Sequence, residues 1–287
     1  MSKKLKVAIA AWEFPWLTFD EICKKARDYG LEYLDCTAPP PDSVPAFLRT
    51  LEKYGVRVAA TGGTARSGSI KMNASTQADI PELQRSFVEA IEIAAQVGAR
   101  YVVSYYGGNL AYDPKASMQR YRRNMQPVLE AAEKHNITIL IETEYNQVAT
   151  DVTRTAYGTL DLVEFMGSEH FKVNFDPCNL TIAGEEGFPH AYHVLKPHIR
   201  HIHLKDATKY DPARHGSEYR KVLQSDAGGS SICVALGRGS LNMEGLLKQI
   251  QADDYQGVLA IELHTLPELT DRVFDESLQY LKAHGVL

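Results

Sequence analysis

Four side chains that can bind a metal ion stand at the ends of apolar runs in the second half of the chain. ITILIE ends in Glu142, KVNFD in Asp176 and VLAIE in Glu262, and HIRHIHLKD contains His203. Any one of them alone would be an ordinary cap, ion-pair partner or core residue. Together they supply the oxygen and nitrogen ligands that suit Mn²⁺, Mg²⁺ or Co²⁺, and also Fe²⁺ or Zn²⁺. Three carboxylates that converge without a cation raise one another's pKa, so the joint pattern predicts a divalent metal site.

The run HIRHIHLKD alternates apolar and polar residues, as a strand with two different faces does. His201 shares a face with His203 but lies deeper, so we expect it to form a hydrogen bond inside the protein. Lys205 and Lys209 follow, and they are either surface lysines or ligands for a hydroxyl, carboxylate or phosphate of a substrate. We expect Asp206 to brace the following loop.

Short β-branched runs alternate with helical patterns along the whole chain, which predicts parallel strands joined by right-handed crossovers. The expected strands are residues 6–11, 32–36, 56–61, 100–106, 137–142, 171–176, 199–205 and 257–263. The expected helices are residues 18–29, 43–54, 80–98, 116–135, 158–167, 188–196, 241–252 and 267–284. Eight such units predict a (β/α)8 TIM barrel, a single domain over residues 1–287. The alternative is a doubly wound sheet, but no glycine-rich dinucleotide turn follows the first strand.

Three long connections follow strands of this pattern, at residues 62–79, 143–157 and 206–240. They lie on the side of a barrel where active sites form. The last is longer than a connection requires, which suggests a lid or an oligomer contact.

The composition of the chain limits the classes of partner that we expect it to bind. The net charge of -5 and the pI of about 6.1 give no electrostatic reason to expect nucleic acid or an anionic membrane. No apolar run approaches the roughly 20 residues of a membrane span, and the N-terminal apolar run suits a strand better than a signal peptide. The four cysteines form no CxxC pair, so we expect a reduced, cytoplasmic protein.

The motifs occur in a recognisable order: the strand ending in Glu142, NFDPCNL, HIHLKD, LGRGSLN and AIELH. Together they resemble the xylose-isomerase-like TIM-barrel superfamily, the sugar phosphate isomerase/epimerase group, over essentially the whole chain. The resemblance implies a divalent ion held by Glu142, Asp176, His203 and Glu262. The ketose 3-epimerase branch implies further that Glu142 and Glu262 are acid/base catalysts on opposite faces of a sugar substrate. Homodimers or homotetramers are common among similar barrels.

This resemblance implies an isomerase or epimerase that acts on a keto-sugar or a related polyol ketone through a metal-stabilised enediolate. Loss of a β-hydroxyl from the same enediolate would instead give a dehydratase of an inosose or keto-sugar acid. Two positions depart from the epimerases. Asn179 stands where they usually have a histidine, and Lys209 where they have an arginine, which argues against a free ketohexose.

Other residues are candidates for binding the substrate at the barrel mouth: Trp12 and Tyr105 as walls for a sugar's apolar face, Asn179, and His264 beside Glu262. A nuclease like endonuclease IV is a remote alternative, since it needs histidines from early strands and the first histidine here is His135. A non-catalytic binding barrel is a third class, against which the intact ligand set argues.

Overall fold

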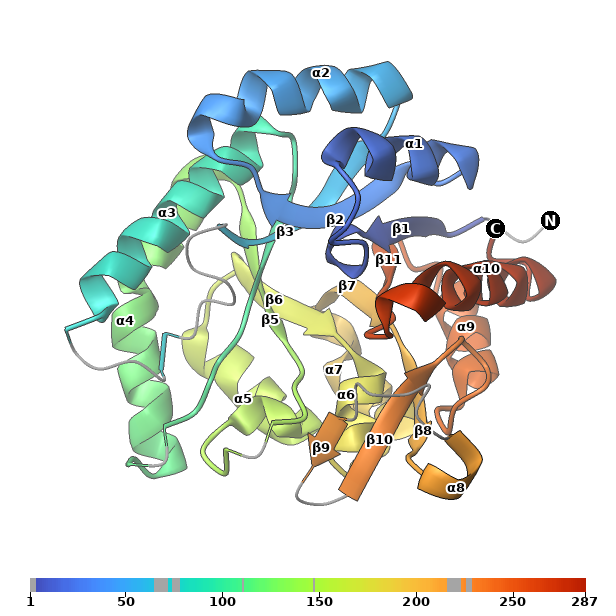
Figure 1. Ribbon diagram of the computed structural model, residues 1–287. Helices are drawn as coiled ribbons and strands as arrows, with labels where there is room; N and C mark the ends of the chain where they lie inside the picture. The colour runs from blue at the N-terminus through green and yellow to red at the C-terminus, as the bar shows by residue number, and fades with distance from the viewer. Residues whose placement is uncertain are drawn as a thin grey trace.

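Eight parallel strands close into a barrel in the order β1-β11-β7-β6-β5-β4-β3-β2 (Figure 1). The structure is a computed structural model that describes residues 4–64, 72–73, 78–109, 111–146, 148–215, 223–225 and 229–287. The barrel strands are β1 (Lys6–Ala10), β2 (Tyr33–Ala38), β3 (Arg57–Thr64), β4 (Tyr101–Ser104), β5 (Thr138–Glu142), β6 (Phe171–Phe175), β7 (Ile199–Leu204) and β11 (Val258–Ile261). The predicted TIM barrel is confirmed.

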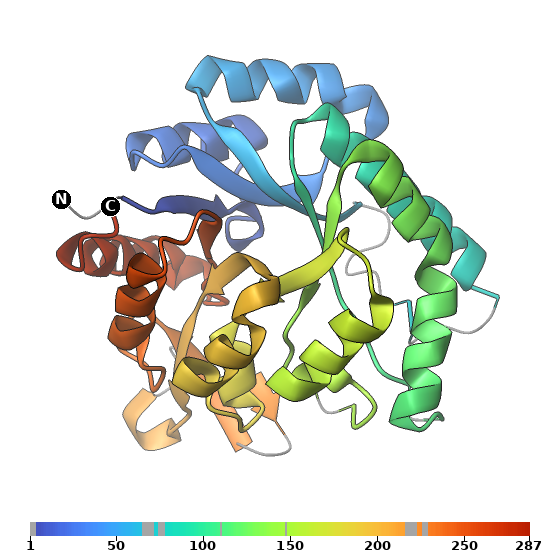
Figure 2. The ribbon, with the colours of Figure 1, turned by 180° about the vertical axis from the view of Figure 1, so that it is seen from behind.

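Helices surround the barrel on its outside, as the view from behind shows (Figure 2). They are α1 (Phe19–Asp28), α2 (Val44–Tyr54), α3 (Ile80–Gln96), α4 (Pro114–His135), α5 (Ala156–Met166), α6 (Pro177–Ile182), α7 (Tyr192–Leu195), α8 (Pro212–His215), α9 (Met243–Ala252) and α10 (Pro267–Ala283). Local signals set several ends: Thr18 and Glu21 form a capping box at the start of α1, and Asn242 caps α9. No helix among the described residues is long and apolar enough to cross a bilayer.

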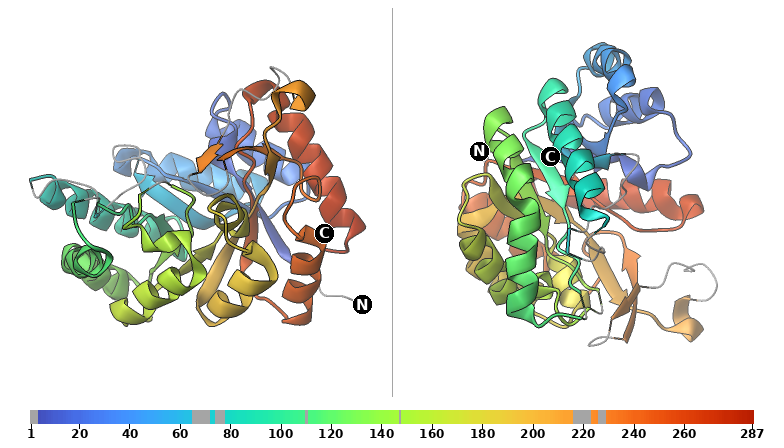
Figure 3. Two further views of the ribbon diagram at one scale, coloured as in Figure 1. Left: turned by 90° about the horizontal axis from the view of Figure 1, so that it is seen from below. Right: turned by 90° about the vertical axis from the view of Figure 1, so that its left-hand side faces the viewer.

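The connection after β7 differs from the predicted irregular loop. Its described part contains β8 (Asp206–Lys209), β9 (Leu223–Ser225) and β10 (Gly229–Val234), which form an antiparallel sheet in the order β8-β10-β9. This sheet lies near α8, outside the ring of barrel strands (Figure 3), and Ala207 and Cys233 of the sheet pack against Cys178 and Ile182 of α6. Its strands are short, and only a few apolar residues of this segment are buried, so their pattern was too weak to predict strands. The helix predicted at 188–196 is present as three consecutive short pieces: a π-helical turn over Gly187–Ala191, α7 and a 3-10 turn over Lys196–His198.

Strand alternation explains why polar residues of β7 face the inside of the barrel. On β7, Ile202 and Leu204 belong to the apolar core that includes the surrounding helices. His201, His203 and Lys205 therefore face the interior, because successive side chains of a strand point to opposite faces.

The sequence LGRGSLN forms a turn around the carboxylate of Asp206. Asp206 accepts the backbone N–H groups of Ala207, Gly237, Gly239 and Leu241, at 3.0, 3.0, 2.9 and 3.3 Å. Burial raises the pKa of Asp206 to about 6, although these four donors favour the charged form. Asp206 thus braces the loop, as expected, and fixes the chain that follows Lys205.

Gly239→Ala is expected to destabilise this turn. A Cβ at this position would lie 2.6 Å from the carbonyl oxygen of Ala207 and still closer to the Asp206 carboxylate, which would have to move and lose its donors. We expect a loss of about 2–4 kcal/mol in the free energy of unfolding, measured by denaturant titration. Gly62→Ala is the matched control, because a Cβ there meets no atom of the described residues within 4 Å. Equal stability of the two variants would contradict this account of the turn.

Candidate metal and active site

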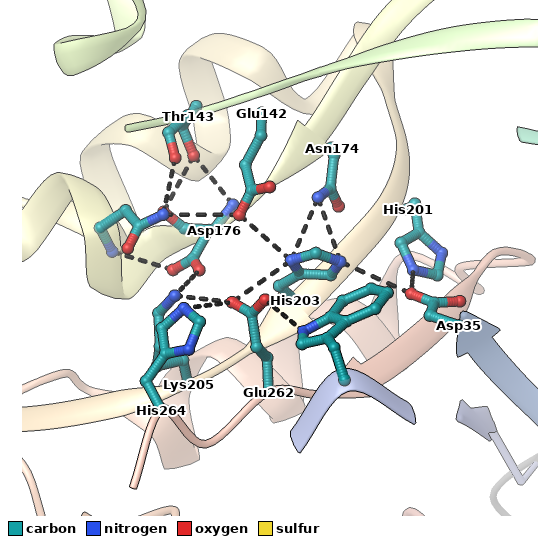
Figure 4. Close-up of polar contacts among 12 residues, drawn as sticks. Asp35, Glu142, Thr143, Asn174, Asp176, His201, His203, Lys205, Glu262 and His264 are labelled. Carbon is teal, nitrogen blue, oxygen red and sulfur yellow. Dashed lines mark hydrogen bonds and ion pairs between the residues drawn. The ribbon is translucent and has the colours of Figure 1, made fainter. Parts of the chain in front are cut away.

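The four predicted metal ligands lie together at the carboxyl ends of four neighbouring barrel strands (Figure 4). Glu142 ends β5, Asp176 follows β6, His203 is on β7 and Glu262 follows β11. All four are buried, and one ligand atom from each lies within 4.8 Å of the others. Parallel strands bring their carboxyl ends to the same rim, so residues spread over 120 positions of sequence meet at one point.

The donor set fits a divalent cation. Glu142 Oε2 is buried and accepts no hydrogen bond from the described part of the chain. Glu142 Oε1 and Glu262 Oε2 both approach His203 Nδ1, at 3.1 and 3.5 Å. Two glutamates, an aspartate and an imidazole are suitable ligands for Mn²⁺, Co²⁺, Fe²⁺ or Zn²⁺. Glu142 Oε2 is thus an oxygen ligand that no described residue uses, and it belongs to a group whose ligand atoms lie within 4.8 Å of one another.

The cluster contains more negatively than positively charged side chains. Burial lowers the pKa of the His203 imidazole, but Glu142 and Glu262 outweigh burial and hold it well above its usual range. Burial raises the pKa of Asp176, with Lys205 opposing and the two glutamates adding to the rise. The cluster thus favours an additional positive charge, which a divalent ion supplies.

Lys205 is part of this cluster and not a surface residue. Its Nζ lies 2.8 Å from Asp176 Oδ2 and 2.7 Å from Glu262 Oε2, and only 1% of the side chain is exposed. Although burial lowers the pKa of Lys205, these two carboxylates hold it well above its usual range. Lys205 therefore neutralises ligand carboxylates, and its ammonium is engaged by protein groups and not directed at solvent.

A second group of residues lies at the start of the chain beside Glu262. Trp12 Nε1 donates to Glu262 Oε1 at 3.0 Å. The neighbouring Glu13 accepts the backbone N–H of His264 at 2.8 Å and lies 3.2 Å from its ring Nδ1. His264 has a φ of 49°, an uncommon backbone conformation for a residue other than glycine, and its Nε2 lies 3.4 Å from Glu262 Oε2. His264 is one-quarter exposed, whereas the ligands are almost fully buried.

Comparison of the chain with known protein families shows which family it belongs to. The sequence profile of the xylose isomerase-like TIM barrel family matches residues 23–284. The chain belongs to this family. The resemblance predicted from the motifs is thereby confirmed. A comparison with curated proteins gave no match.

Solved structures with this fold include enzymes of different reaction types. The probable 3-DHS dehydratase AsbF of Bacillus anthracis, involved in petrobactin synthesis, has a TM-score of 0.75 at 17% identity, over 97% of this chain and 99% of that one. D-allulose 3-epimerase from Methylomonas sp., in complex with D-allulose, has a TM-score of 0.74 at 15% identity, over 98% of each chain. The IOLI protein with a bound zinc atom has a TM-score of 0.70 at 15% identity, over 98% and 97%. At these identities the likeness shows the fold alone.

Of the other predicted substrate-binding residues of this xylose isomerase-like barrel, some lie at the cluster of metal ligands and one does not. Tyr105 lies at the cluster, where burial and the charges of Glu142 and Glu262 raise its pKa well above the usual range. Asn179 is buried at the start of α6 and donates to the Thr143 carbonyl at 2.9 Å and toward Glu142 Oε1 at 3.5 Å. Lys209 is exposed on β8, where its backbone pairs with Ser231. The structure thus brings Tyr105 and Asn179 to the cluster, while the Lys209 side chain is at the surface.

Several residues of the site were missed by sequence reasoning. One of them is Thr143. Its hydroxyl accepts the backbone N–H of Asp176 and donates to the Asp176 carbonyl oxygen, both at 2.9 Å, where Asp176 is the N-cap of α6. Asp35 on β2 lies 2.6 Å from His201 and 3.5 Å from His203. An aspartate between Leu34 and Cys36 in the predicted strand EYLDC was a visible signal for Asp35. Glu13 follows the first strand beside Trp12 and so was visible as a polar residue at the barrel mouth, but its contact with His264, 251 residues away, was not predicted.

Proposed function

We propose that this protein is a divalent-metal-dependent epimerase or isomerase of a keto-sugar or a related polyol ketone. The observation that carries the proposal is the position of Glu142 and Glu262. They come from β5 and β11, which β6 and β7 separate in the barrel, yet both reach the same nitrogen of His203. Two carboxylates that approach one point from different strands are suited to act on two faces of a substrate.

Glu142, Asp176, His203 and Glu262 would hold the ion. When bound, the ion withdraws electrons from the carbonyl group of a hydroxyketone and so acidifies the neighbouring C–H bond. One of the two glutamates takes this proton. Return of a proton by the other glutamate to the opposite face inverts the carbon, and return to the neighbouring carbon, with transfer of a hydroxyl proton, gives isomerisation.

The remaining residues bind and orient the substrate. Trp12 holds Glu262 through its indole N–H and offers its ring as a wall for a sugar's apolar face. Tyr105 and Asn179 both interact with Glu142, and the ammonium of Lys205 favours the charged forms of Asp176 and Glu262. The D-allulose complex of a barrel with this fold supports a sugar-sized ligand. The cytoplasmic location and the homodimer or homotetramer expected from the sequence stay predictions, as do substrate binding by Lys209 and the single domain over residues 1–287.

A metal-dependent dehydratase of an inosose or keto-sugar acid is the second candidate, and His264 favours it. Its ring is held between Glu13 and Glu262 and is partly exposed, so it can protonate a leaving hydroxyl group. The dehydratase with the same fold agrees with this alternative.

Deuterium exchange separates the two reactions. Incubation of keto-sugars and inososes in D₂O with the Mn²⁺-loaded protein is expected to place deuterium on the carbon next to the carbonyl, with an epimer or isomer as product. Mass spectrometry and NMR of the products give the measurement. Loss of water from the substrate would establish the dehydratase instead. An absence of both exchange and elimination across the panel would contradict the proposed enzyme class.

A further inference from the structure

The buried aspartate of β2 lies at the site, but the proposed reaction gives it no role. Asp35 lies inside the barrel, and His201 and His203 are fully buried beside it (Figure 4). Its Oδ1 accepts the backbone N–H of Ala60 at 3.1 Å. Its Oδ2 lies 2.6 Å from His201 Nε2 and 3.5 Å from His203 Nε2. One carboxylate oxygen thus faces two histidine rings.

The two nitrogens of His203 face different surroundings. Nδ1 is directed at the ligand carboxylates, 3.1 Å from Glu142 and 3.5 Å from Glu262, whereas Nε2 is directed at Asp35. Asn174 Nδ2 is 3.2 Å from both ring nitrogens, so it lies over the ring and not along the lone-pair direction of either one. Among the described residues that contact Nε2, Asp35 is therefore the one with an acceptor for an Nε2–H group.

A histidine binds a metal through an unprotonated ring nitrogen, and its other nitrogen then carries the proton. A carboxylate that accepts this proton fixes the tautomer and the ring orientation and makes the ligand more basic. We infer that Asp35 is the positioning residue that directs Nδ1 of His203 to the metal. The inference rests on the proposed metal site and assigns the aspartate of β2 to it.

Asp35, His201 and His203 are not better explained as a second metal site. The distance of 2.6 Å between Asp35 Oδ2 and His201 Nε2 is that of a hydrogen bond. Two ligands that each lie about 2.1 Å from one ion in a tetrahedral site are about 3.4 Å apart. The short contact therefore places a proton between these atoms and not an ion.

A purely structural role is the rival explanation, because His201 alone could be the reason for a buried aspartate. The two roles predict different behaviour for two matched variants. Asp35→Asn keeps the volume and an acceptor for Ala60, but it presents an N–H group to the histidines. His203 must then accept at Nε2 and carry its proton on Nδ1, where the metal binds. His201→Asn breaks the same buried pair and leaves Asp35 facing His203.

The test is titration of the purified metal-free protein and both variants with Co²⁺, followed by its visible absorption and by competition with a chelator. We expect Asp35→Asn to bind Co²⁺ about 10- to 100-fold more weakly than the wild-type protein, and His201→Asn to remain within about threefold of it. Circular dichroism and thermal melting establish that both variants are folded.

Other results of this titration would contradict either the role of Asp35 or the metal site itself. Wild-type affinity in Asp35→Asn, or an equal loss in both variants, overturns the role of Asp35 and leaves the proposed function standing. A wild-type protein that binds no Co²⁺ overturns the metal site itself. If Asp35→Asn does not fold, NMR of isotope-labelled histidine in the Zn²⁺-loaded wild-type protein decides. We expect a metal-bound Nδ1 and a protonated Nε2 in His203, and a metal-bound Nε2 overturns the inference.

Discussion

Glu142→Gln and Glu262→Gln are each expected to lower the rate of substrate proton exchange by about a thousandfold or more. A glutamine can occupy the same volume and can offer its carbonyl oxygen to a metal ion, but it cannot take a proton from carbon. General acid–base catalysis by a positioned side chain contributes about 10²–10⁴-fold, and the weakened metal site adds to this loss. Both effects act in the same direction in each variant.

The measurement is deuterium incorporation from D₂O into the substrate that the screen identifies, with metal content determined on the same samples. Glu169→Gln is the matched control, since this side chain is 90% exposed and pairs with Lys172 at the other end of β6. Its exchange rate should equal that of the wild-type protein. Near-normal exchange in either Glu142→Gln or Glu262→Gln, with metal bound, would refute the acid/base role of that glutamate. Inversion without exchange in both would refute the proton-transfer mechanism.

The barrel was predictable because its signals are local and repeated. An apolar run such as ITILIE or VLAIE, followed by a helical pattern, marks one unit whatever the rest of the chain does. The position of Glu142 and Glu262 then follows from topology, since all parallel strands end at the same rim. The four ligands could be named together for this reason, although the distances between them could not.

The contacts that orient the ligands could not be predicted in the same way. Trp12 contacts Glu262 and Asp35 contacts His203, and the two residues of each pair lie far apart in the sequence. Such contacts depend on which strands are neighbours after the barrel closes and on rotamers inside it, and no period in the sequence carries that information. Lys205 shows the consequence: its strand position was visible, but only the structure shows that its ammonium is held between Asp176 and Glu262.

Removal of divalent metal is expected to abolish activity and to lower thermal stability. The cluster holds three buried carboxylates and one lysine, so an ion that binds the folded protein relieves their repulsion. Binding at about 100-fold above the dissociation constant stabilises the folded state by about 2.7 kcal/mol, which corresponds to a rise of several degrees in the melting temperature.

The experiment compares protein dialysed against a chelator with the same protein after addition of Mn²⁺ or Co²⁺. Exchange activity should fall to about 1% or less and return at close to one ion per chain, as metal analysis of the purified protein should also find. The melting temperature should rise with the same stoichiometry, a result that needs no knowledge of the substrate. His203→Asn provides the comparison, because the loss of an imidazole ligand should abolish the metal-dependent rise in melting temperature. If the activity and the melting temperature of the chelated protein respond to neither ion, the metal-dependent mechanism is wrong. Lys205 would then be the main positive charge that balances the buried carboxylates.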